Sequence, residues 1–113
     1  MGISEPASGN SVVRSLQSFH HETRGKRDWY DIRKSLHWRI KRDLQADRNA
    51  VMWVLQEWLK SGYETVASLA VSFAIEFDLA ELRDDLLRYS QDDTLMPNER
   101  KQLSKWLTGL KND

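Results

Sequence analysis

One stretch of the chain constrains the fold more than any other: Ser61 to Asp78, which reads SGYETVASLAVSFAIEFD. It is the least charged and most apolar segment, yet its residues keep a helical period. At 100° per residue, one broad face holds Val66, Leu69, Ala70, Phe73, Ala74 and Phe77. The opposite side carries Thr65, Ser68, Ser72 and Glu76. This pattern predicts the central helix of an all-α domain.

Both ends of this predicted helix carry a capping signal. Ser61-x-x-Glu64 matches a capping box at its start, and Asp78-x-x-Glu81 matches a second box, which would begin the next helix. The two boxes therefore predict where the central helix is separated from its neighbours.

The rest of the chain adds amphipathic segments of the same kind. Helices are predicted over 12–21, 29–45, 50–60 and 79–90, with a last one that starts at Pro97. Within 29–45 the apolar stripe consists of Trp29, Ile32, Leu36, Ile40 and Leu44. Asp28 is a suitable N-cap for that helix, and Asp47 or Asn49 for the next. Residues 50–60 are apolar around most of the circumference, so that helix should be buried on several sides.

No strand pattern competes with these helices. The expected architecture is a compact bundle, or a short stack, of about five to six helices joined by tight turns. Residues 1–11 lack periodicity and contain Gly, Ser, Pro and Asn, so they are expected to form a flexible tail. Residues 12–113 are expected to form a single helical domain.

The charges of the chain are unevenly distributed. The formal net charge is zero, but residues 24–42 hold eight basic and two acidic side chains, whereas residues 76–93 hold seven acidic and two basic ones. Such local charge poles bear on partners more than the neutral average does. We expect the two poles to lie apart and solvated, because exposed ion pairs contribute only about 0–1 kcal/mol each.

Composition also bounds the cellular setting. The chain has no cysteine, which excludes disulfides and thiolate metal sites and fits a reducing compartment. No apolar run reaches the roughly 18–20 residues that a membrane-spanning helix needs. A cytoplasmic protein that does not enter the membrane is therefore expected.

Signals for catalysis are weak. Of the three histidines, His20 and His21 are adjacent, which is not the spacing of three or four that metal ligands on a helix require, and His37 stands alone. There is no glycine-rich phosphate loop and no nucleophile motif. The sequence thus predicts a non-enzymatic protein with no metal and no cofactor. A small enzyme without a local motif remains the second alternative.

The most informative surface feature is Trp38. On the helix predicted over 29–45 it falls opposite the apolar stripe, and its neighbours are Lys34, Lys41 and Arg42. Tryptophan and arginine dominate protein-binding hot spots, so one hypothesis is a protein–protein interaction module of the adaptor, inhibitor or assembly-factor type. An aromatic ring among cations also suits nucleic acid, so an accessory protein that binds nucleic acid is the alternative. A third interpretation is structural: the N-terminal helix covers the ring. The oligomeric state cannot be inferred from these patterns.

Overall fold

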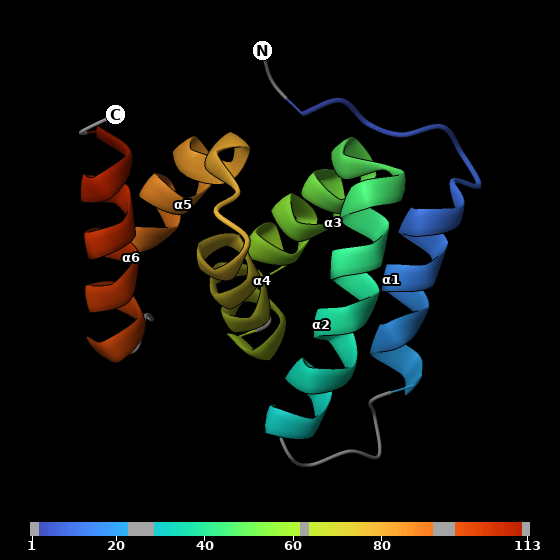
Figure 1. The fold of residues 1–113 in the computed structure, drawn as a ribbon, viewed down its shortest axis with the longest axis horizontal. Coiled ribbons are helices and arrows are strands. Elements are labelled where there is room, and N and C mark those ends of the chain that lie inside the picture. The colour runs from blue at the N-terminus through green and yellow to red at the C-terminus, as the bar shows by residue number, and fades with distance from the viewer. Residues whose placement is uncertain (1–2, 23–28, 62–63, 92–96, 112–113) are drawn as a thin grey trace. The chain divides into compact units, whose positions relative to one another are not determined.

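The computed structural model confirms the all-α class. It describes the chain at residues 3–22, 29–61, 64–91 and 97–111; within these ranges, only the backbone is described at residues 19–22, 29–30, 64–65, 97–99 and 110–111. No strand occurs in the described part of the chain, and Figure 1 shows its helices. In chain order they are α1 (Ser11–Glu22), α2 (Trp29–Ala46), α3 (Arg48–Lys60), α4 (Glu64–Glu76), the short 3₁₀ helix η1 (Ala80–Leu82), α5 (Arg83–Ser90) and α6 (Pro97–Lys111).

The predicted helices all occur, with ends that differ by a few residues. The segment 79–90 is divided into η1 and α5. Asp47 caps α3, since its Oδ1 accepts the N–H of Ala50 at 3.2 Å. The predicted cap Asp28, and the side chains of Glu64, Trp29, His20 and His21, lie outside what the structure describes.

The chain divides into two compact units, residues 1–54 and 55–113, with the boundary inside α3. The buried apolar side chains of the first unit are Val12, Leu16, Ile32, Leu36, Ile40, Ala50, Val51, Met52 and Val54. Those of the second are Leu55, Trp58, Leu59, Val66, Ala67, Leu69, Ala70, Val71, Phe73, Ala74, Leu79, Leu82, Leu86, Leu103 and Leu107. Both sets include residues of α3, which is buried around most of its circumference, as its sequence predicted.

Helix α4 supplies the largest fully buried side chain among the described residues, Phe73. The predicted inner face is confirmed from Val66 to Ala74, and the half-buried Phe77 stacks on Phe73 with ring centroids 6.2 Å apart. The buried arc is wider than predicted, however, because Ala67 and Val71 are also buried. Ser68 and Ser72 are consequently half-buried rather than fully exposed.

The end of α4 corrects one prediction. Asp78 does not cap the next helix: it has φ 52°, in the left-handed region, and the N-cap of η1 is Leu79 without a side-chain hydrogen bond. The N–H of Leu79 bonds to the carbonyl of Ala74 at 2.8 Å, and the N–H of Asp78 bonds to that of Ile75 at 3.3 Å. These two bonds form a Schellman motif, in which aspartate occupies the position that glycine usually takes.

The Asp78 side chain compensates for this backbone by binding α6. Its Oδ1 accepts the indole N–H of Trp106 at 2.9 Å. We expect Asp78→Ala to be less stable than Asp78→Gly by about 1 kcal/mol, because both lose the indole bond but only alanine keeps the left-handed strain. Asp78→Asn keeps an acceptor oxygen and tolerates the left-handed region, so it should lie within about 0.5 kcal/mol of the wild type. Urea titration measures all three, and equal stability of the alanine and glycine variants would contradict the assigned conformation.

In the first unit, contacts to α2 and α3 hold the N-terminal segment. Asn10 caps α1, since its Oδ1 accepts the N–H groups of Val12 and Val13 at 2.9 and 3.1 Å. Its Nδ2 also donates to Oδ2 of Asp47 at 3.0 Å. Ser4 and Asn49 form a reciprocal pair, at 3.1 Å from the Ser4 N–H and 2.7 Å from the Asn49 Nδ2. The segment before α1 is thus tied to the start of α3.

Candidate functional site

Trp38 lies on the solvent side of α2. Its exposed fraction is 63%, and among the described residues the only other large apolar side chain that is exposed is Leu87, at 39%. The residues Ile32, Leu36 and Ile40, on the other side of the helix, are buried. The interpretation in which the N-terminal helix covers Trp38 is therefore wrong. Large exposed aromatic side chains often mark contact sites.

The three predicted basic neighbours lie around the ring. Lys34, Lys41 and Arg42 precede or follow Trp38 by three or four residues on α2, and all three are exposed. The Nζ of Lys41 lies 5.2 Å from the centroid of the indole ring, within the range of a cation–π contact. His37 contacts the same ring edge-on, with centroids 5.1 Å apart and an interplanar angle of 88°. These contacts restrict the orientation of the ring without covering it. We call Trp38 with Lys34, Lys41 and Arg42 the α2 outer face.

A small depression lies beside the ring. It has a volume of about 270 Å³ and is lined by Asp31, Arg33, Lys34, His37 and Trp38. This is below the roughly 300–1,000 Å³ of typical small-molecule sites. Its lining is mixed in charge, because the carboxylate of Asp31 faces the same space as the basic groups. The depression therefore suits a single side chain of a partner better than a cofactor.

Arg42 is the least independent of the predicted site residues. Its Nε lies 3.2 Å from Oδ1 of Asp43, although 70% of the arginine side chain is exposed. One of its donors is thus already used, which reduces the positive charge that Arg42 offers to a partner. Lys34 and Lys41 therefore provide the more direct charge beside Trp38.

Asp43 is a residue that the sequence pattern missed. It is 5% exposed and is the one polar side chain in the buried class within the described ranges. The predicted stripe continued to Leu44, which is instead half-buried. The spacing is consistent with burial of Asp43, because positions 36, 40, 43 and 47 follow one another at intervals of four, three and four and so lie on one face of the helix. Asp43 was nevertheless not predicted to be buried, because ionised side chains are almost never fully buried unless they are paired.

The acidic pole lies in the second unit and is partly neutralised there. Glu81 and Asp84 are exposed, but Asp85 accepts a hydrogen bond from Gln56 at 2.9 Å and pairs with Arg88 at 2.7 Å. Asp85 thus has a structural role between α3 and α5. The basic α2 outer face and this acidic region belong to different units.

Within the described ranges, no group of three or more His, Cys, Asp or Glu side chains is placed to hold a metal ion. None of the helices, over the same residues, is both long and apolar enough to cross a membrane.

Comparisons with protein-family models, with curated proteins and with solved structures found no match for this chain. Any inference about function therefore rests on the side chains of this chain itself.

Proposed function

We propose that this protein is a non-enzymatic, cytoplasmic interaction module that binds an acidic surface of another protein through the α2 outer face. Trp38 is the anchor, and Lys34, Lys41 and Arg42 supply the surrounding positive charge. The observation that carries this proposal is the 63% exposure of Trp38 on a helix whose other side already supplies buried apolar residues. Exposed aromatic side chains that become buried in a complex dominate binding energies in protein interfaces.

Three features favour a protein partner over nucleic acid. Asp31 lines the depression beside Trp38, where it would repel a phosphate. Arg42 is engaged by Asp43, so one of the four side chains of the face has part of its charge compensated. The formal net charge of the chain is zero, whereas nucleic-acid-binding domains are usually strongly basic.

Trp38→Ala is expected to weaken partner binding by about 2 kcal/mol or more, which corresponds to roughly 30-fold in Kd. The fold should remain intact, because the ring is mostly exposed. Leu87→Ala is the matched control: it also removes a large exposed apolar side chain, but on α5. Partners are identified by affinity capture from an extract of the source cells with the wild type and both variants. Each protein lost only with Trp38→Ala is then purified and titrated by calorimetry.

The same experiment distinguishes the nucleic-acid alternative. Capture is repeated after nuclease treatment, and a partner that disappears with nuclease points to nucleic acid. In that case, neutralising Lys34, Lys41 and Arg42 together should reduce the magnitude of the slope of log K against log salt by roughly 2–3. With an acidic protein partner, the triple variant should mainly lower the association rate. Equal affinity of wild type and Trp38→Ala for every purified partner would refute the proposal.

A further inference from the structure

A buried carboxylate lies on a different side of α2 from Trp38. Asp43 is 5% exposed, and one of its oxygens, Oδ1, is 3.2 Å from Nε of Arg42. The other oxygen, Oδ2, is buried and has no hydrogen-bond partner among the groups that the structure describes. A buried carboxylate with an unsatisfied oxygen is unfavourable, because the lost hydration is not replaced. The question is therefore which residues lie opposite the Asp43 carboxylate.

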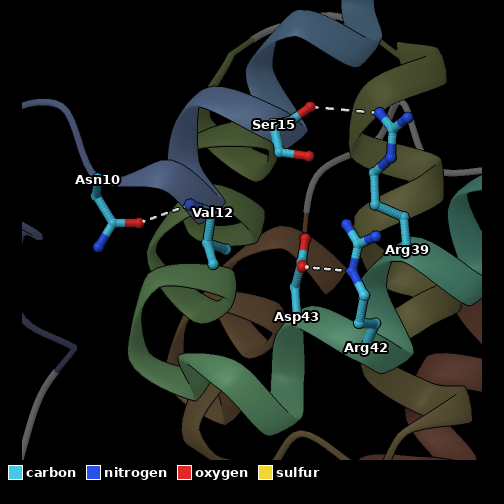
Figure 2. A network of polar contacts seen from close by, with 6 residues as sticks. All are labelled: Asn10, Val12, Ser15, Arg39, Arg42 and Asp43. Atoms are coloured by element: carbon cyan, nitrogen blue, oxygen red, sulfur yellow. Dashed lines mark hydrogen bonds and ion pairs between the residues drawn. The ribbon is translucent and has the colours of Figure 1, made fainter.

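Helix α1 faces Asp43. Arg39 lies four residues before Asp43 and Asp47 lies four residues after it. All three residues therefore lie on the same side of α2 and its C-terminal end. Both neighbours contact the α1 segment: Nη1 of Arg39 donates to the carbonyl of Ser15 at 3.4 Å, and Asp47 accepts from Asn10 at 3.0 Å. Asp43 therefore faces α1 between Asn10 and Ser15, and Figure 2 shows these residues together.

The residue that α1 buries in this interval is Val12, which is 7% exposed. Valine has no side-chain donor, so it cannot satisfy a carboxylate. The basic residue in the same interval, Arg14, is exposed. Among the described side chains of α1, only Val12 and Leu16 are buried, and the Arg39–Ser15 bond is at the long end of the hydrogen-bond range. Among the described residues, α1 thus supplies no donor for Oδ2 of Asp43, whereas Oδ1 is already paired with Arg42.

We propose that the side of α2 beneath α1 is a second docking surface, for a partner helix that places a lysine or arginine opposite Asp43, with α1 occupying this side in the unbound chain. The incoming cation would give Oδ2 a charge-assisted hydrogen bond that Val12 cannot provide. Ile40 and Leu36, next to Asp43 along the buried side of α2, would supply the apolar part of the contact. This proposal does not involve Trp38, and the variant Trp38→Ala should leave it unchanged.

The site can be tested by giving α1 the missing cation in the full-length chain. Val12→Lys is compared with Val12→Met, which has a similar unbranched stem without the charge. Amide hydrogen exchange across residues 11–18 measures how often α1 leaves α2. We expect protection to be at least 10-fold higher with lysine than with methionine. In an Asp43→Asn background, this difference should disappear. Equal protection of the lysine and methionine variants with Asp43 present would show that Oδ2 is already satisfied, and would overturn the proposal.

A second measurement covers the case in which Val12→Lys fails to pack. A synthetic peptide of residues 9–22 carrying Val12→Lys is added to the wild-type protein at millimolar concentration, which is comparable to the effective concentration of a tethered helix. It should lower the exchange protection of the protein's own α1, whereas the Val12→Met peptide, or the Asp43→Asn protein, should show no such change. If the lysine peptide has no effect, or if α1 exchanges only as fast as α2, then α1 is not displaceable and the proposal is wrong.

Discussion

Phe73→Ala is expected to lower the free energy of unfolding by about 3–5 kcal/mol. Phe73 is 0% exposed and has the largest fully buried side chain in the part of the chain that the structure describes. Its removal leaves a cavity in the middle of α4 and also removes the stacking partner of Phe77. Since domains of this size are stable by only about 5–15 kcal/mol, the variant could lose half of its stability. Urea titration followed by far-UV circular dichroism measures the loss.

Ser68→Ala is the control on the same helix. Ser68 is half-buried, so the substitution should cost no more than the net value of one hydrogen bond, about 0.5–1.5 kcal/mol. Phe73→Ala and Ser68→Ala of equal stability would show that α4 is turned differently from the orientation described. Hydrogen exchange of the amides in α4 would locate the change within the second unit.

Leu36→Ala is expected to have the next largest effect, a loss of about 2–5 kcal/mol. Leu36 is 0% exposed in the middle of α2 and belongs to the first unit. Leu87→Ala makes the same change at a leucine that is 39% exposed, and it should cost less than about 1 kcal/mol. Urea titration of both variants checks the difference. A loss of less than 1 kcal/mol at Leu36 would mean that this side of α2 is not packed as described.

Much of the helical architecture can be predicted from the sequence, because apolar spacing and turn chemistry act locally. The inner face of α4 follows from the spacing of Val66, Leu69 and Phe73, and Pro97 correctly marks the start of α6. The cap of α3 is predictable for the same reason, since Asp47 needs only the N–H of Ala50, three residues further on. Local rules of this kind do not require knowledge of the tertiary structure.

The errors arise where a distant residue decides the outcome. Asp78 has the sequence of a helix N-cap, but the carbonyls at the end of α4 and the indole of Trp106, 28 residues away, hold it in a left-handed turn instead. Asp43 is a charged residue of the kind usually found at the surface, yet it is only 5% exposed, on the side of α2 where Arg39 bonds to Ser15 of α1. A helical wheel contains neither α1 nor α6, so it cannot anticipate these two environments.

The candidate site is predictable in part. The spacing of Lys34, Trp38 and Lys41 on one face follows from helical geometry, and the structure adds that the ring is exposed and that Lys41 lies over it. The pairing of Arg42 with Asp43 was not predicted, because adjacent residues on a helix do not normally face each other. Its consequence for binding is that Lys34 and Lys41 should contribute more than Arg42.

The position of the unit boundary limits how the protein can be dissected. The division between Val54 and Leu55 lies within α3, where both residues are buried, rather than in an exposed linker. A recombinant fragment that ended there would lose the hydrogen bonds that run from each N–H of the helix to the carbonyl four residues earlier. Extending one fragment to include all of α3 would deprive the other of buried side chains. Recombinant versions for crystallisation or for fusion experiments should therefore keep the two units in one polypeptide.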